Sequence, residues 1–212
     1  MNEFVLYGRP GWGSAIVEAQ LAWYGLPFRL EDSGDLLGSD EARATMRPLN
    51  PLAQVPVLVL PGGATMTESA AITLHLADLT GRDDLVPGAK APERAAFLRW
   101  LVFIVANIYP TFTYADIPER FVKTEGAAAG FRAEVDAYVQ HLWQIVEAEA
   151  SAPHFLGTRF SALDLYLAVM TRWRPGPKWF AEHAPKLAEA ARAASERVEV
   201  AEVMARNFPK KA

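Results

Sequence analysis

The chain contains no cysteine among its 212 residues. This absence excludes disulfide bonds, thiolate-bound metals and a protein-borne cysteine nucleophile, and it fits a reducing compartment. The N-terminal residues also lack a basic segment followed by an apolar run, so no secretory signal is visible. We therefore expect a cytoplasmic protein.

An excess of one charge and long apolar runs are also lacking. The net charge is −4 and charged residues make up 22% of the chain, which gives no electrostatic support for nucleic-acid binding. The apolar stretch 100–108 is too short to cross a bilayer and includes Asn107. The four histidines have no metal-ligand spacing, and no P-loop, Rossmann glycine pattern or nucleophile elbow occurs. We expect no nucleic acid, no membrane and no metal.

The most informative stretch is 50–79. The apolar run 57–60 is short enough for a strand, and a Pro-Gly-Gly turn ends it. Residues 64–66 can return as a partner strand, which makes a hairpin. Thr67 is a suitable cap for a helix over 70–79, where the apolar residues have helical spacing.

This stretch also contains main-chain and polar groups that suit a peptide ligand. Pro56 has no N–H to donate and is tolerated where a strand starts. If its bond to Val55 is cis, the Val55 N–H and C=O face outward and can pair with an extended peptide; a trans bond is the commoner alternative. Glu68 and Ser69 stand at a helix start, where free N–H groups and the dipole favour a carboxylate. With the acidic side chain of Glu68, the pair suits an amino-acid head group that carries both charges.

The residues before this stretch predict a small sheet layer. We expect a strand over 3–7, a helix over 14–24 that Gly25 stops, and a second strand over 28–30. A short helix is expected within 40–46. Strand, helix, strand, hairpin and helix is the order of a thioredoxin-like layer of four strands.

The residues after this stretch predict helices. Residues 81–91 are rich in turn-forming and charged residues, which marks a domain boundary. The sequence thus predicts an α+β protein with an N-terminal thioredoxin-like domain (1–80), a linker (81–91) and a C-terminal all-α helical bundle (92–212). Its apolar-periodic runs are 93–106, 127–150, 163–173 and 185–206.

Three features of this helical part carry further predictions. We expect Pro110 to kink or end the first run. The run 163–173 is apolar nearly all round, so it should be the central helix of the bundle. Ser161 and Asp164 precede it with the spacing of a capping box; a catalytic Ser/Asp pair is less favoured because no histidine is suitably near.

Two segments carry a resemblance to a known family. The V-P pair, followed by E-S-x-A-I, resembles the glutathione-binding half of cytosolic glutathione transferases. The segment G-T-R-F-S-A-L-D resembles the structural signature of that family's helical domain, so the resemblance covers nearly the whole chain. It implies that Val55, next to a cis Pro56, pairs with the cysteinyl backbone of glutathione. It further implies that Glu68 and Ser69 hold the γ-glutamyl end, and that Gln54 contacts the glycine carboxylate.

The chain departs from the family at one position, and its thiol-activating residue is open. The family usually has glycine where Ala53 stands. A free thiol is only about 3% ionised at pH 7, and lowering its pKa by about two units takes roughly 2.7 kcal/mol. Ser14, which opens the first helix as in serine-type members, is the favoured hydroxyl donor, and Tyr7 is the alternative. Both have structural alternatives, as a helix cap and as a sheet residue.

The resemblance also implies where a second substrate binds. It should lie between the domains, lined by Trp12, Phe103, Asn107, Tyr109, Phe112 and Tyr114, although an aromatic stripe is more often core. We expect a homodimeric glutathione transferase that conjugates a small hydrophobic electrophile. The alternatives are a glutathione-dependent isomerase or dehalogenase, and a non-catalytic ligand-binding or scaffold protein of the same fold.

Overall fold

A computed structural model of the chain describes residues 3–209. Its sheet has the strand order β2-β1-β3-β4, in which β1 runs parallel to β2 and antiparallel to β3. β4 pairs antiparallel with β3, so the expected hairpin is present. The strands are β1 (Phe4–Gly8), β2 (Phe28–Asp32), β3 (Val57–Val59) and β4 (Thr65–Met66).

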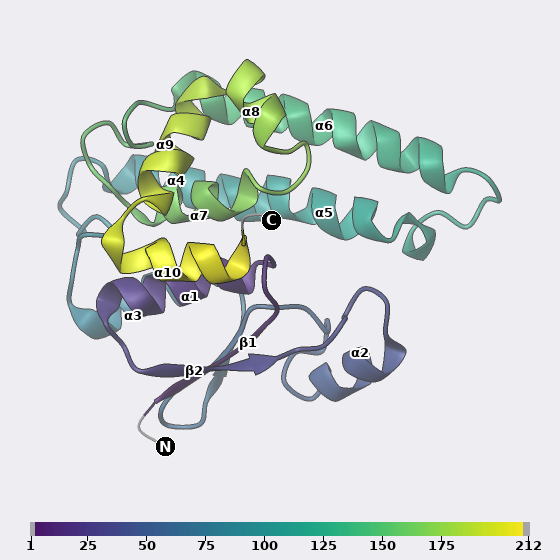
Figure 1. The fold of residues 1–212 in the computed structure, drawn as a ribbon, viewed down its shortest axis with the longest axis horizontal. Coiled ribbons are helices and arrows are strands. Elements are labelled where there is room, and N and C mark those ends of the chain that lie inside the picture. The colour runs from purple at the N-terminus through teal and green to yellow at the C-terminus, as the bar shows by residue number, and fades with distance from the viewer. Residues whose placement is uncertain (1–2, 210–212) are drawn as a thin grey trace.

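Two helices lie between the sheet and the helical half of the molecule (Figure 1). They are α1 (Ser14–Tyr24) and α3 (Ser69–Thr80), and each ends at a glycine with positive φ, as the sequence predicted for α1. The short helix α2 (Asp40–Met46) is also present as expected and lies away from the bundle. This mixed sheet with its helices gives the thioredoxin-like N-terminal half that the sequence predicted.

The first long helical run of the second half does not end at Pro110. α4 (Arg94–Phe103) continues through a π-helical turn (Ile104–Ile108) into α5 (Tyr109–Asp116). Pro110 lies in the first turn of α5, where its missing N–H costs little. The wider π-helical turn before it makes room for the proline ring, so the helix continues. Of the two expected effects of Pro110, an end to the helix was therefore wrong, and a kink stays a prediction.

The resulting run Arg94–Asp116 spans 23 residues and has a mean hydropathy of 1.5 over its most apolar window. Its length and composition alone would allow it to cross a membrane. The sequence had indicated only the shorter stretch 100–108, which is too short to do so. In the structure α4 packs on α7 and α5 packs on α6, as core helices of a bundle do.

Of the remaining helices, α7 packs against α1, α4 and α9. All nine residues of α7 are buried, which confirms its predicted central place. α8 was not expected, because it is short and starts at a proline after Gly176. α10 packs against α1, so the end of the chain returns to the N-terminal half (Figure 1). The helices are α6 (Ala128–Glu149), α7 (Ala162–Met170), α8 (Pro177–His183), α9 (Pro185–Ser195) and α10 (Val198–Asn207), with a 3-10 turn at Pro118–Arg120.

The start of α7 carries the capping interaction that the sequence predicted. Asp164 is fully buried, and its carboxylate accepts hydrogen bonds from the main-chain N–H groups of Ser161 and Phe155, both at 2.8 Å. The Ser161 hydroxyl donates a third bond at 3.2 Å. These bonds satisfy two buried N–H groups that would otherwise lack a partner.

Buried side chains form one large cluster that includes residues of β1, α1, α7, α9 and α10. A second, small cluster beside α2 consists of Leu36, Met46, Ala53 and Val57. Because the large cluster joins both halves of the chain, the division into domains 1–80 and 92–212 stays a prediction. The small cluster supports the loops that form the candidate site.

Candidate functional site

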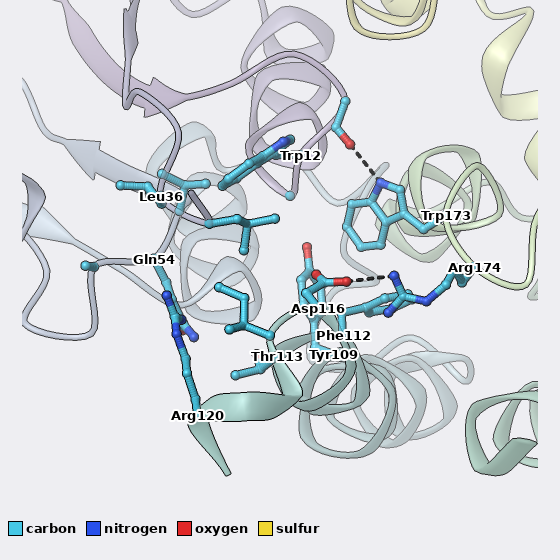
Figure 2. Close-up of a pocket in the computed structure, with 16 residues that line it drawn as sticks. Trp12, Leu36, Gln54, Tyr109, Phe112, Thr113, Asp116, Arg120, Trp173 and Arg174 are labelled. Carbon is cyan, nitrogen blue, oxygen red and sulfur yellow. Dashed lines mark hydrogen bonds and ion pairs between the residues drawn. The ribbon is translucent and has the colours of Figure 1, made fainter. Parts of the chain in front are cut away.

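The loop between β1 and α1 is held by the C-terminal half of the chain. The main-chain N–H of Gly11 donates to Asn207 Oδ1 at 3.0 Å. Its C=O accepts from the indole N–H of Trp173 at 2.7 Å (Figure 2). Gly11 has φ of 80°, a region that L side chains rarely adopt. Two contacts from opposite directions thus fix the loop that carries Trp12 and Gly13.

Asn207 is itself held by a buried carboxylate on α1. Its side-chain N–H₂ donates to Glu18 Oε2 at 2.9 Å, and Arg206 pairs with the other oxygen of Glu18. Glu18 is only 3% exposed, so this pairing balances a charge that would be costly to bury alone. The hydrogen bonds between Glu18 and Asn207 and between Asn207 and Gly11 therefore join α1, α10 and the loop.

A cavity of about 450 Å³ opens beside this loop. Trp12 and Leu36 line it from the N-terminal half (Figure 2), and Val55 lines it from the same half. The opposite wall comes from α5 and the segments after it and after α7, through Tyr109, Phe112, Thr113, Asp116, Ile117, Arg120, Trp173 and Arg174. Its lining is mainly apolar and aromatic, as in most small-molecule sites.

A smaller cavity of about 220 Å³ adjoins the first. The two share Gln54, Val55, Tyr109 and Thr113 in their linings. Pro56, Glu68, Ser69 and Tyr114 also line the smaller one. The structure thus brings all the predicted glutathione-binding residues to one pair of neighbouring cavities.

The loop before β3 exposes an unused main-chain edge. The Val55–Pro56 bond is cis. Within residues 3–209, no hydrogen bond uses the N–H or the C=O of Val55. The side chain of Asn50 fixes the loop, since its amide donates to the carbonyl of Gln54 at 2.8 Å. Ala53 has φ of 50°, in the left-handed region where the family usually has glycine, so the loop keeps that shape at a cost of about 1–2 kcal/mol.

Glu68 also has an uncommon backbone conformation. Its φ is 66° and its ψ is 101°, at the N-cap position of α3. Thr67, which the sequence indicated as the cap, therefore lies outside that position, and no side chain caps the helix. The first turn of α3 thus keeps free N–H groups beside Ser69, which is 7% exposed. Strained residues of this kind cluster at ligand-binding positions.

Comparison with known proteins identifies the family. Residues 14–79 match the profile of the glutathione S-transferase N-terminal domain. The chain is 37% identical over 203 residues to YncG of Escherichia coli K12, an uncharacterised GST-like protein, and the match covers 95% of this chain and 97% of YncG. The chain belongs to the glutathione S-transferase family. It is also 29% identical over 171 residues to glutathione S-transferase GST-4.5 of Xanthomonas campestris, across 79% and 81% of the two chains.

Solved structures of glutathione transferases have the same fold. A homologue from Sulfitobacter with bound glutathione has a TM-score of 0.81 at 24% identity, over 96% of this chain and 97% of the other. A sphingomonad glutathione S-transferase complexed with glutathione has a TM-score of 0.71 at 27% identity, over 94% and 96%. The fold of this glutathione S-transferase family member is therefore the one that the sequence predicted.

In this glutathione S-transferase family member, Ser14 and Tyr7 line neither cavity, although the sequence favoured their hydroxyls for thiol activation. Ser14 Oγ accepts a hydrogen bond from the N–H of Arg9 at 3.2 Å and lies where a side chain on Gly8 would be, 2.1 Å from that Cβ position. Tyr7 packs against the small cluster of Leu36, Met46, Ala53 and Val57. Both roles remain predictions that the geometry does not favour.

The residues predicted for the second substrate separate into three groups, of which one is Tyr114 alone, in the lining of the smaller cavity only. Trp12, Tyr109 and Phe112 line the larger cavity. Phe103 and Asn107 line neither cavity; Asn107 is exposed and donates only to the carbonyl of Phe103. The π-helical turn explains the difference, because it changes the helical phase between Phe103 and Tyr109.

Sequence reasoning missed the charged and aromatic residues that come from the far end of the chain. Arg174 pairs with Asp116 at 2.7 Å (Figure 2). It also pairs with Asp136 at 3.0 Å, and the two carboxylates balance its charge at the cavity wall. Trp173 packs edge-on against Tyr109 and Phe112. No local pattern marks these residues, since their partners are tens of positions away.

Metal binding has no support in the part of the chain that the structure describes. There, no three histidine, aspartate or glutamate side chains are grouped so that they could hold an ion. The absence of a metal cofactor stays a prediction.

Proposed function

We propose that this protein binds glutathione and activates its thiol for conjugation to a small hydrophobic electrophile. The observation that carries the proposal is the unpaired main-chain edge of Val55, which lies where the two cavities meet. An extended peptide can form two hydrogen bonds with such an edge, as a strand does with a neighbouring strand. The glutathione bound by related structures supports the same ligand here.

The γ-glutamyl end of glutathione is proposed to occupy the smaller cavity. Its carboxylate would accept hydrogen bonds from the Ser69 hydroxyl and from the free N–H groups at the start of α3. Its ammonium would pair with the carboxylate of Glu68, for which no hydrogen bond or ion pair is found among the described residues. Gln54, in the lining of both cavities, is the proposed contact of the glycine carboxylate.

The electrophile is proposed to bind in the larger cavity, against the rings of Trp12, Tyr109 and Phe112. The thiol loses its proton to solvent, and the sulfur lone pair forms a bond to the electrophilic carbon. With a chloro-nitroarene, chloride then leaves with the electron pair of its former bond. Apolar walls that exclude water favour such a reaction, because they leave the thiolate poorly solvated except where the protein donates hydrogen bonds.

A non-catalytic glutathione-binding protein is the second candidate. The placement of Ser14 and Tyr7 outside both cavities favours it, because these are the hydroxyls that the family resemblance offers for thiol activation. An isomerase or dehalogenase would use the same glutathione site and differ only in the electrophile.

The test combines glutathione affinity with turnover of a chromogenic chloro-nitroarene. Calorimetry should detect one glutathione site per chain, and Glu68→Gln should weaken binding by about tenfold, the effect of one lost charge-assisted hydrogen bond. Glu202→Gln, an exposed residue on α10, is the matched control and should leave affinity unchanged. Binding without turnover of any electrophile class would favour the non-catalytic protein, and absence of binding would refute the proposal.

We further propose a cytoplasmic homodimer. Leu79 on α3 and Val102 on α4 are 54% and 56% exposed, which leaves apolar side chains for a second copy to cover. Light scattering after size exclusion should give twice the mass of the 23.3 kDa chain. A mass of one chain at micromolar concentration would contradict the dimer.

A further inference from the structure

We propose that the hydroxyl of Tyr109, together with the main-chain N–H groups of Gly13 and Ser14, binds and stabilises the thiolate of glutathione. Tyr109 is then the catalytic donor, in place of the two hydroxyls that the sequence indicated. The inference rests on the proposed function, because it assigns the thiol to a position within the same two cavities.

The hydroxyl of Tyr109 lies beside the first helix and has no partner. A Cβ on Gly13 would lie 2.5 Å from its oxygen, so the hydroxyl takes the space that any larger residue at position 13 would fill. The oxygen is shielded from solvent, and no hydrogen bond to it exists in the described part of the chain. A buried hydroxyl normally has a partner, so an unpaired one in a residue that lines both cavities marks a position for a ligand contact.

The start of α1 supplies two more donors at the same place. Within the described chain, the N–H groups of Gly13 and Ser14 donate no hydrogen bond, whereas Ala15 and Ile16 already donate to the carbonyls of Trp12 and Gly13. The free N–H groups and the dipole of this eleven-residue helix favour a negative charge. In Figure 2 the ring of Tyr109 extends from α5 toward the loop that carries Trp12.

The proposed path of glutathione brings its thiol to this point. Its cysteinyl main chain pairs with Val55, and its γ-glutamyl end lies near Glu68 and Ser69 in the smaller cavity. Val55 and Tyr109 are in the lining of both cavities, so the cysteine side chain between them reaches the boundary of the larger cavity. The electrophile in the larger cavity is then next to the sulfur.

The charges around the hydroxyl allow it to act as a donor. Burial raises the pKa of Tyr109 well above its usual value, so the phenol keeps its proton at neutral pH. Asp116 and Arg174 face the larger cavity as an ion pair, and Arg120 adds a positive charge to the wall. Glu68 faces the smaller cavity, and Tyr166 on α7 keeps its proton because burial raises its pKa to about 12.

The test replaces Tyr109 by phenylalanine. Tyr109→Phe removes only the hydroxyl and keeps the ring that packs edge-on against Trp173. The pKa of bound glutathione, followed by the ultraviolet absorbance of its thiolate, should rise by about one to two units, the effect of one lost hydrogen bond to a charged group. The value of kcat/KM should fall by about 10- to 100-fold at pH values below the new pKa, and the loss should shrink as the pH is raised.

Binding and control measurements separate this inference from the proposed function. Tyr109→Phe should keep glutathione affinity within about threefold, since the thiol contact is one of several. Tyr138→Phe, on the exposed face of α6, is the matched control and should change neither the pKa nor the rate. If wild-type protein binds glutathione and Tyr109→Phe leaves the thiol pKa unchanged, the role of Tyr109 is refuted and the proposed function stands. If Ser14→Ala alone raises that pKa, the role belongs to Ser14. If wild-type protein does not bind glutathione, both fail.

Discussion

The contact between Gly11 and Asn207 predicts a large loss of stability in Asn207→Ala. The asparagine is 6% exposed, accepts from the N–H of Gly11, and donates to Glu18 and to the carbonyl of Val203. Its removal leaves the Gly11 N–H and one oxygen of a buried carboxylate without a protein partner. At about 1–3 kcal/mol for each of these two groups, the free energy of unfolding should fall by about 2–6 kcal/mol.

Guanidinium denaturation measures this change, and Asn107→Ala is its matched control. Asn107 is exposed and bonds only to the carbonyl of Phe103, so its replacement should alter the unfolding free energy by about 0.5 kcal/mol or less. The midpoint should move while the denaturant slope stays constant, because the folded state keeps its compactness. A loss below 1 kcal/mol in Asn207→Ala would refute the reasoning.

A double-mutant cycle tests whether the two anchors of Gly11 act together. Trp173→Phe removes the indole N–H that donates to the Gly11 carbonyl but keeps an aromatic ring beside Tyr109 and Phe112. Because both contacts position the same peptide, their effects on stability should deviate from additivity by about 0.5 kcal/mol or more. Additive effects would mean that the loop keeps its place when either anchor is lost.

Two further predictions concern Asp164 and Glu68. Burial raises the pKa of Asp164 to about 6, so the folded state takes up a proton that the unfolded state, near 3.8, does not. The stabilisation from this proton uptake is complete below pH 3.8 and is lost as the pH rises through 6. When the pH is lowered from 7 to 5, the free energy of unfolding of the wild type should therefore rise by about 1 kcal/mol relative to that of Asp164→Asn, as paired denaturation curves would show. A difference that stays constant with pH would contradict the raised pKa of Asp164. Glu68→Gly should relieve the positive φ and raise stability by about 1 kcal/mol while weakening glutathione binding, as thermal melts and calorimetry would show; lower stability would mean that the conformation carries no strain.

Elements with a strong local signal were predictable from the sequence. The helix Ser14–Tyr24, the hairpin after Pro56 and the cap at Asp164 were expected where the structure has them. Each depends on residues within a few positions of one another, so propensity, spacing and turn chemistry determine them. The end of the helix expected at Pro110 was wrong because a π-helical turn can accommodate a proline that an α-helix interior does not.

The candidate site was only partly predictable for the same reason. Val55, Glu68 and Ser69 lie within fifteen positions of one another, and the structure brings them to one cavity. The orientation of the Ser14 hydroxyl depends on the missing side chain of Gly8, and the place of Tyr109 depends on helical phase. The sequence pattern predicts neither the orientation of the Ser14 hydroxyl nor the position of Tyr109.

The bond between Gly11 and Asn207 has a consequence for biosynthesis. Because Asn207 follows every residue that lines the two cavities, a ribosome produces the whole sheet and both cavity walls before the side chain that fastens the first loop. A nascent chain should therefore acquire its ligand pocket only after residue 207 has left the exit tunnel. A chain that stops before this position would lose the fastened loop although every residue that lines the cavities had been synthesised.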